Sequence, residues 1–197
     1  MRIILASQSQ ARARMLHSAG IEYVAVPADI DEEALAGKSF AEGCCVEETA
    51  LFLAREKAEK ISAQYPDALV IGSDQILVCE GVLFSKAPNA ESAREKLRTL
   101  RGKTHALVSG VAVAQNARMI WQIKDHALLT MKHFDDMFLE HYCEKAGPAL
   151  TKNVGAYALE GLGVRLFERI AGDYFTILGM PLLPLLRYLE QEQGLRL

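Results

Sequence analysis

The stretch Ala68-Leu69-Val70-Ile71-Gly72-Ser73-Asp74-Gln75-Ile76-Leu77-Val78 decides the fold of this chain. Apolar residues fill it on both sides of Gly72-Ser73-Asp74-Gln75, which is typical of a strand buried in a sheet that is covered on both faces. A buried ionised carboxylate costs on the order of several kcal/mol unless a cation, a metal or hydrogen bonds meet it. We therefore expect Asp74 to be functional. The alternative is a structural aspartate that caps a turn where Gly72 and Ser73 break the strand.

Strand and helix patterns alternate around this stretch and predict a mixed-sheet α/β protein, with no repeat and no clear linker. The length of 197 residues suits one domain or a two-lobed one. We predict strands over residues 1–6, 21–26, 68–78, 82–84, 104–114, 119–130, 165–170 and 174–177. We predict helices over residues 9–19, 46–63, 91–100, 133–145 and 181–191, and an acidic loop over residues 29–43.

Composition excludes several classes of partner. The net charge is -3 and no block is rich in lysine or arginine, so a nucleic-acid polymer is not an expected partner. No apolar run approaches the ~18 residues of a membrane helix, and the first residues do not resemble a signal peptide. The four cysteines lack the CxxC spacing of a metal or redox site, which favours free thiols in a cytoplasmic protein.

One lysine falls on the apolar face of a predicted helix. The inward stripe of helix 46–63 consists of Ala50, Leu53, Ala54, Ala58 and Ile61, and Lys57 lies on it. Either Lys57 meets an anion, such as Asp74 or a phosphate, or its amine reaches solvent at the edge of the stripe. Lys86, after the short strand 82–84, reads as a surface lysine when taken alone.

Two further segments suggest phosphate and metal binding. Ser7 to Arg12 joins a strand to a helix, and the N–H groups at such a helix start, with Arg12 or Arg14, would bind an anion. The alternative is an ordinary serine cap. The acidic run Asp29, Asp31, Glu32 and Glu33 either supplies a second carboxylate to a metal or is a solvated loop.

Taken together, motifs across nearly the whole chain resemble those of the Maf family in order and spacing. They include SxSxxR at residues 7–12, Asp31-Glu32, LAREKA at 53–58, GSDQ at 72–75, Ser85-Lys86, RGKTH at 101–105, GAY at 155–157, LFERI at 166–170, GDY at 172–174 and GMP at 179–181. The resemblance implies one Maf-like domain over residues 1–197. It has the inosine-triphosphatase-like (Maf/Ham1) fold, an elongated mixed β-sheet flanked by helices, with two lobes around a central cleft.

The resemblance also implies an activity, hydrolysis of a nucleoside triphosphate to the monophosphate and pyrophosphate with Mg²⁺ or Mn²⁺. It implies a cytoplasmic protein that is often a homodimer. Two rivals remain open: a small-molecule phosphatase acting on monophosphates, and a nucleotide-binding regulator of cell division that does not turn over, since the family is linked to septum inhibition.

Roles follow residue by residue from the resemblance. Asp74 resembles the proton acceptor, and Glu32, Lys57 and Lys86 resemble the polar shell around metal and phosphates, with Asp74 and Glu32 as metal ligands. Ser7, Ser9 and Arg12 resemble the triphosphate-binding turn. The chain departs from the family pattern at Gln10-Ala11, where the family has Pro-Arg, at Ser85-Lys86-Ala87, where it has Gly-Lys-Pro, and at Asn153, where it commonly has Lys.

Base preference is expected to depend on Ala11, Gln75 and Glu160. The family's dTTP and UTP branch has Arg, Thr and Gln there, whereas GSDQ and Leu159-Glu160-Gly161-Leu162-Gly163 look like the 7-methyl-GTP pyrophosphatase branch. A carboxylate at Glu160 can accept from guanine N1–H and N2–H₂, but it would repel the carbonyls of thymine or uracil. We therefore expect 7-methyl-GTP as the substrate, with dTTP or UTP as the alternative. Ala11 counts against this because that branch commonly has an aromatic residue there for stacking.

Overall fold

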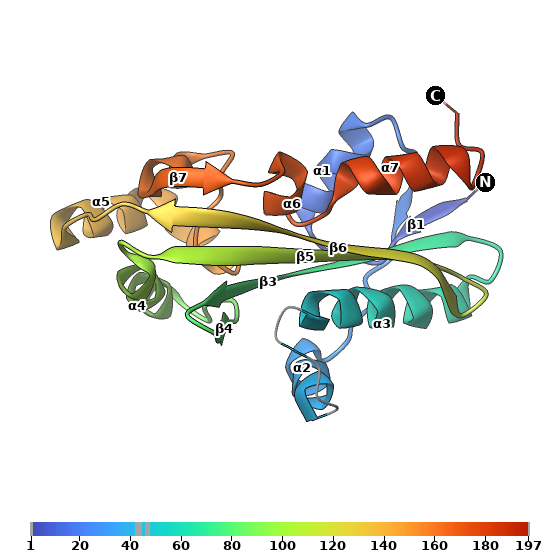
Figure 1. Cartoon of the computed structure of the whole chain (residues 1–197), viewed down its shortest axis with the longest axis horizontal. Coiled ribbons are helices and arrows are strands. Elements are labelled where there is room, and N and C mark those ends of the chain that lie inside the picture. The colour runs from blue at the N-terminus through green and yellow to red at the C-terminus, as the bar shows by residue number, and fades with distance from the viewer. Residues whose placement is uncertain (1, 42–44, 46–47, 197) are drawn as a thin grey trace. The chain divides into compact units, whose positions relative to one another are not determined.

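A computed structural model describes residues 2–41, 45 and 48–196, with the backbone alone for residues 33 and 38–41. Within these residues the strands form one sheet in the order β2-β1-β3-β5-β6-β7, with β4 paired to β3 (Figure 1). The strands are β1 Ile3–Leu5, β2 Val24–Ala25, β3 Leu69–Cys79, β4 Val82–Phe84, β5 Thr104–Gln115, β6 Arg118–Met131 and β7 Phe167–Ala171. β1 is parallel to β2 and β3, whereas β4 and β7 pair antiparallel with β3 and β6. The predicted mixed-sheet α/β class is confirmed.

Helices separate most of the strands along the chain. They are α1 Gln10–Ser18, α2 Glu32–Ala41, α3 Thr49–Gln64, α4 Ala90–Leu100, α5 Asp136–Ala146, α6 Tyr174–Ile177 and α7 Leu182–Gln191, with 3-10 helices η2 Gly147–Thr151 and η3 Leu162–Leu166. No helix in the part of the chain that the structure describes is long and apolar enough to span a membrane.

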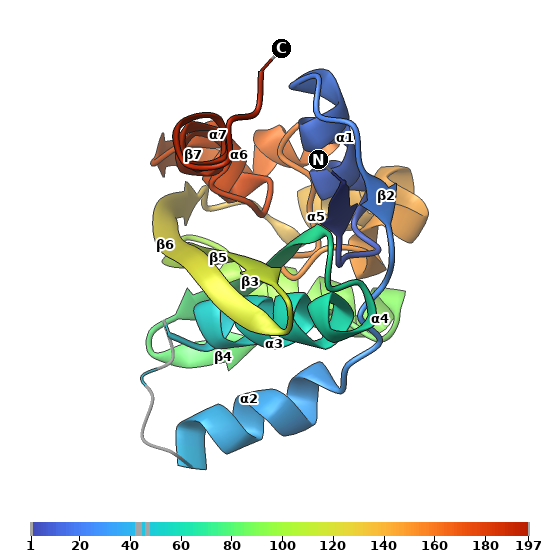
Figure 2. The same cartoon turned by 90° about the vertical axis from the view of Figure 1, so that its right-hand side faces the viewer.

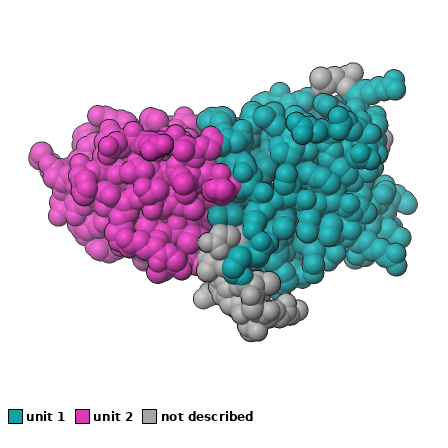
Figure 3. Space-filling view, in the orientation of Figure 1, with its two compact units in different colours: residues 1–75, 108–125, 173–197 teal, residues 76–107, 126–172 magenta. Residues whose placement is uncertain are grey.

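The chain divides into two compact units, coloured separately in Figure 3. Unit 1 consists of residues 1–75, 108–125 and 173–197, and unit 2 of residues 76–107 and 126–172. Three strands, β3, β5 and β6, contribute residues to both units.

In unit 1, helices cover both faces of the sheet. α3 covers one face, and α1 and α7 cover the other, as the end-on view of Figure 2 shows. Alternate residues of β1 serve the two faces: Ile3 and Leu5 pack in one cluster with Leu16 of α1 and Leu185 of α7, whereas Ile4 packs in another with Ile61. A central strand in unit 1 must therefore present apolar residues to both faces, which explains the hydrophobic run Leu69-Val70-Ile71 in β3.

Unit 2 is built around α4 and a buried aromatic group. α4 packs against α5 and η2 and buries Ala93, Leu97 and Leu100. Near it, His105 Nε2 and the Tyr157 hydroxyl lie 2.6 Å apart, and the Phe167 ring packs edge-on against Tyr157.

Most of the predicted elements are confirmed with bounds that differ by up to three residues, and three predictions are wrong. Residue 1 of the first predicted strand, residues 42 and 43 of the predicted loop and residues 46 and 47 of the predicted helix 46–63 lie outside the described residues. Residues 32–41 of the expected acidic loop form α2, because Asp31 accepts from the Ala34 N–H at 3.0 Å and acidic side chains suit a helix N-terminus. Residues 174–177 form the helix α6 and not a strand, because Asp173 caps them by accepting from the Thr176 N–H at 3.0 Å. The expected strand 21–26 shrinks to Val24–Ala25, which is exposed and offers little apolar surface to bury.

The cysteines agree with the expected free thiols where they are described. Cys79 and Cys143 are buried and unpaired, and Cys45 is exposed and unpaired. Cys44 lies outside the described residues.

Candidate active site

Two glycines bring α3 onto the sheet in unit 1. A Cβ atom at Gly72 would lie 2.2 Å from the Ala54 carbonyl oxygen, and one at Gly110 would lie 2.7 Å from the Ala50 carbonyl oxygen. Contacts this close are not tolerated, so the helix backbone can rest on β3 and β5 only because both positions lack a side chain. This approach places the next turn of α3, with Lys57, over the residues that follow Gly72.

Lys57 lies between two carboxylates. Its Nζ donates to Asp74 Oδ1 at 2.5 Å and to Glu32 Oε1 at 2.6 Å. The Lys57 and Asp74 side chains are each 8% exposed, whereas that of Glu32, in the first turn of α2, is 49% exposed. Of the two interpretations left open by the sequence, the structure therefore favours an inward lysine that meets an anion over one that reaches solvent.

The environment of Asp74 shifts its protonation. Burial raises the pKa of the Asp74 carboxyl above its ordinary value, and the cations Lys57 and Arg12 oppose that shift. A carboxylate with a raised pKa is a stronger base, so the arrangement suits a group that accepts a proton.

The turn after β1 is organised by Arg12. Ser9 caps α1 by accepting from the Arg12 N–H at 3.4 Å, and the Ser9 N–H donates to Ser7 Oγ at 3.2 Å. The buried Arg12 side chain donates from Nη1 to Ser7 Oγ at 3.2 Å and from Nε to the Gly179 carbonyl at 2.9 Å. Two of its donors are thus used inside the protein, and they fix the serine turn to the segment between α6 and α7.

The residues on either side of Asp74 hold the same segment. Ser73 is fully buried, and its hydroxyl lies 2.9 Å from the carbonyl oxygens of Gly110 and Gly179. Gln75 Nε2 lies 3.0 Å from Ser109 Oγ and 3.0 Å from the carbonyls of Thr176 and Ile177. Gln75, on which base preference was expected to depend, therefore has its carboxamide nitrogen against backbone carbonyls of α6.

Ser109 is a further polar residue of this site that was not expected from the sequence. Its hydroxyl donates to the Thr176 carbonyl at 2.8 Å, and it is fully buried in the apolar strand β5. A polar residue within an apolar strand is the signal that marked Asp74, and the same signal would have found Ser109.

The remaining predicted site residues divide between the units. Ala11 is half-buried on α1 in unit 1. Lys86 and Glu160 both belong to unit 2, where each is exposed. Unit 1 by itself therefore brings together Ser7, Ser9, Arg12, Glu32, Lys57, Asp74 and Gln75.

The carboxylates near Lys57 are of the chemical type that binds Mg²⁺ or Mn²⁺. No group of three or more histidine, cysteine, aspartate or glutamate side chains among the described residues could hold a metal ion. Asp74 and Glu32 nevertheless bring two carboxylates to the same amine. Mg²⁺ is usually held by one or two carboxylates plus substrate phosphates and water, so these two carboxylates are the residues that could hold such an ion.

Comparison with known proteins shows which family the chain resembles in sequence. A family model described as Maf-like protein matches residues 2–192. A protein of Granulibacter bethesdensis named nucleoside triphosphate pyrophosphatase is 50% identical over 195 residues, which is 99% of each chain. A protein of Brucella abortus named 7-methyl-GTP pyrophosphatase is 42% identical and covers 98% of this chain and 97% of its own.

Among solved structures, a HAM1 protein from Coxiella burnetii matches 68% of this chain and 74% of its own at 18% identity, with a TM-score of 0.41. The family model and the full-length relatives together show the family. The chain belongs to the Maf family.

Proposed function

We propose that this protein hydrolyses a nucleoside triphosphate to the nucleoside monophosphate and pyrophosphate. One observation carries the proposal, a buried carboxylate, Asp74, in contact with a buried ammonium, Lys57, in a chain of the Maf family. The relatives named nucleoside triphosphate pyrophosphatase support it.

In the proposed reaction, Asp74 accepts a proton from a water molecule while the water oxygen bonds to the α-phosphorus. The bond from that phosphorus to the bridging oxygen breaks, and pyrophosphate leaves with the electron pair. Lys57 stabilises the charge that develops on the phosphates, and Lys86 assists it, as the family resemblance implies. Arg12 and Ser7 orient the triphosphate chain through the turn that they stabilise.

Asp74 and Glu32 would hold a divalent cation, Mg²⁺ or Mn²⁺, together with the substrate phosphates. When bound, the ion supplies positive charge that neutralises the leaving pyrophosphate. Lys57 Nζ donates to both carboxylates, so its ammonium group offsets part of their negative charge and holds the two side chains in place. The expected observation is Mg²⁺ or Mn²⁺ binding by titration calorimetry that weakens in Glu32→Gln.

Product analysis tests the reaction directly. The purified protein is incubated with Mg²⁺ and a panel of canonical and modified nucleoside triphosphates, and the released phosphorus species are identified. Pyrophosphate with the monophosphate is the expected result. Release of orthophosphate would point to the phosphatase, and nucleotide binding without any release would point to a non-catalytic regulator.

We further propose a preference for 7-methyl-GTP over dTTP and UTP. The carboxylate of Glu160 accepts from guanine N1–H and N2–H₂ and attracts the positive charge of the methylated ring, whereas it disfavours the carbonyls of thymine and uracil. A polar site of this kind discriminates by factors of up to ~10⁴. The 7-methyl-GTP pyrophosphatase relatives support this preference.

Two single variants distinguish a residue that contacts the base from a residue that stabilises the site. Glu160→Gln is expected to lower kcat/KM for 7-methyl-GTP and to narrow its advantage over UTP. Gln75→Thr removes hydrogen bonds to α6 and is expected to lower kcat/KM for all substrates alike. Higher kcat/KM for dTTP or UTP in the unmodified protein would overturn the preference. The homodimer and the cytoplasmic location stay predictions from the family resemblance.

A further inference from the structure

A second lysine, in unit 2, lies on the apolar face of its helix. α4 buries Ala93, Leu97 and Leu100, and Lys96 falls three residues after Ala93 and four before Leu100. Residues at this spacing share one helix face, so the lysine stem follows the buried stripe. Lys96 is half-buried.

The amine of Lys96 binds backbone carbonyls and no carboxylate. Its Nζ donates to the Val154 carbonyl at 2.8 Å and to the Ser85 carbonyl. Within the described residues, no carboxylate lies within ion-pair distance of this amine. Burial lowers the pKa of Lys96 to about 8, as expected for an ammonium without an anionic partner.

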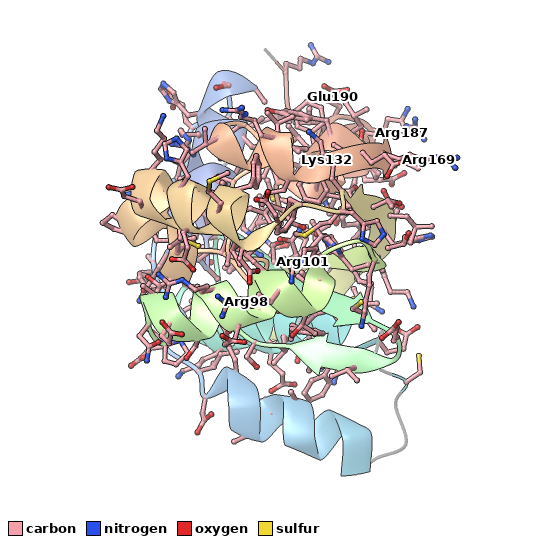
Figure 4. The ribbon with its side chains drawn as sticks, turned by 90° about the vertical axis from the view of Figure 1, so that its left-hand side faces the viewer. Arg98, Arg101, Lys132, Arg169, Arg187 and Glu190 are labelled. Carbon is pink, nitrogen blue, oxygen red and sulfur yellow. The ribbon has the colours of Figure 1, made fainter. Side chains whose placement is uncertain are left out.

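Two arginines near Lys96 pair with carboxylates instead of carbonyls. Arg98, in the last turn of α4, and Arg101, which ends the helix, are labelled in Figure 4. Arg101 pairs with Asp136 of α5 at 2.8 Å, and Arg98 pairs with Glu140 at 3.4 Å. Surface carboxylates neutralise these arginines, whereas Lys96 uses its charge to hold two pieces of main chain.

Both pieces of main chain lead to residues of the proposed site. Ser85 directly precedes Lys86. Val154 begins the loop that runs to Glu160, and this loop is fixed a second time where Asn153 Nδ2 donates to the Tyr157 carbonyl at 2.9 Å. A single ammonium group therefore joins the segment of the phosphate-binding lysine to the segment of the base-binding glutamate.

We propose that Lys96 is a positioning residue for substrate binding, which ties the Ser85-Lys86 segment to the 153–160 loop through its two carbonyl hydrogen bonds. This inference rests on the proposed function. It assigns Lys96 no contact with substrate, and its effect passes through Lys86 and Glu160.

A positioning role of this kind changes binding more than chemistry. The proposed proton acceptor, Asp74, belongs to unit 1, whereas the two hydrogen bonds of Lys96 lie within unit 2. Loss of the tie is therefore expected to raise KM about tenfold while kcat changes less than about threefold, which is the pattern of lost uniform binding. The loss is expected for 7-methyl-GTP and for other nucleoside triphosphates, because the tie affects the phosphate contact as well as the base contact.

The test compares Lys96→Met, Lys96→Arg and the control Lys103→Met. Methionine fills the apolar stripe without donors, and arginine keeps both the charge and the donors. Lys103 also joins two segments of unit 2, through an exposed pair with Glu80 at 2.8 Å, so its loss is expected to leave KM unchanged. Steady-state kinetics and hydrogen exchange of the folded variants are measured side by side.

The expected result is a raised KM in Lys96→Met, partial recovery in Lys96→Arg, and faster amide exchange confined to residues 83–88 and 152–160. An unchanged KM in a folded Lys96→Met, or a fall in thermal stability with no change in KM or local exchange, would overturn the proposal. If Lys96→Met does not fold, Lys96→Gln, which keeps one donor group, takes its place under the same criteria.

Failure of the proposed function is recognised separately. If the unmodified protein binds nucleoside triphosphates without releasing pyrophosphate, the proposed reaction fails, and the Kd of 7-methyl-GTP by calorimetry replaces KM in the comparison of variants. If the unmodified protein binds no nucleotide at all, both proposals are overturned.

Discussion

The two units differ in how they hold a lysine that lies on the buried face of a helix. Unit 1 pairs its lysine with carboxylates, with Lys57 held between Asp74 and Glu32. Unit 2 buries polar groups against neutral partners: the Lys96 amine meets two carbonyls, and His105 meets the Tyr157 hydroxyl at 2.6 Å. Burial lowers the pKa of Lys96 to about 8 and that of His105 to about 4.

This difference distinguishes residues that are expected to act in the reaction from residues that are expected to stabilise loops. A buried ion pair stabilises a fold weakly, because desolvation offsets much of the attraction, so it is best explained by a task that needs charge. Hydrogen bonds to uncharged partners, such as those from the Lys96 ammonium to two carbonyls, hold loops in place. The carboxylates around Lys57 are therefore expected to control turnover, and the hydrogen bonds of Lys96 and His105 are expected to control the shape and stability of the loops in unit 2.

The largest effect is expected from Asp74→Asn. The amide keeps the size of the side chain but loses its basicity, so kcat is expected to fall by about 10³-fold or more, within the range of lost general-base catalysis. Circular dichroism is expected to show an intact fold. Asp67→Asn, an exposed aspartate before β3, serves as the control and should keep full activity. Near-normal turnover in Asp74→Asn would end its assignment as proton acceptor.

Lys57→Met is expected to lower kcat by about 10²-fold, since the phosphates lose a cation. Because it leaves Asp74 buried with Arg12 as its remaining nearby cation, it is also expected to destabilise the fold by about 2 kcal/mol at pH 7. Urea unfolding and steady-state kinetics measure both effects. Lys60→Met, an exposed lysine of the same helix, should change neither. If Lys57→Met keeps its activity and loses only stability, Lys57 is structural.

Gly72→Ala tests whether the close packing of α3 on β3 is what brings Lys57 to Asp74. The added methyl group collides with the Ala54 carbonyl and pushes α3 away from β3, at a cost of about 1–3 kcal/mol for overpacking. Activity is expected to fall about tenfold, because a displaced catalytic group loses rate steeply. Gly37 in α2 has open space around it, so Gly37→Ala is the matched control. Equal kinetics in the two variants would show that helix placement does not limit turnover.

The smallest effect at neutral pH is expected from His105→Gln. The pKa of folded His105 is about 4, below the ordinary 6.5, so the unfolded chain takes up a proton first as the pH falls. The stability that His105 contributes is present above pH 6.5 and is lost as the pH falls towards 4, by up to about 3 kcal/mol. His105→Gln should flatten this part of the stability curve measured by urea unfolding, whereas exposed His141→Gln should not. Parallel curves for all three proteins would contradict the assignment.

Prediction from sequence succeeded where one residue broke a strong pattern. Asp74 in an apolar strand and Lys57 on an apolar stripe were both recognised from spacing, and the structure brings them to 2.5 Å. Lys96, like Lys57, is a lysine on the apolar face of its helix. It could not be recognised from the sequence, because α4 is short and polar and its apolar stripe has only three buried residues. The helix α2 was missed because an acidic run looks solvated until the cap at Asp31 is considered.

The sequence by itself determined the class of fold, the family and the buried charges, because these depend on periodicity, on motif order and on the cost of placing a carboxylate among apolar residues. Only the tertiary structure decided the partners. Glu32 meets Lys57 across 25 positions, and Gln75 lies against α6 across about 100. Which donor meets which acceptor depends on how the helices pack on the sheet. A local sequence pattern does not specify contacts between residues that are so far apart in the chain.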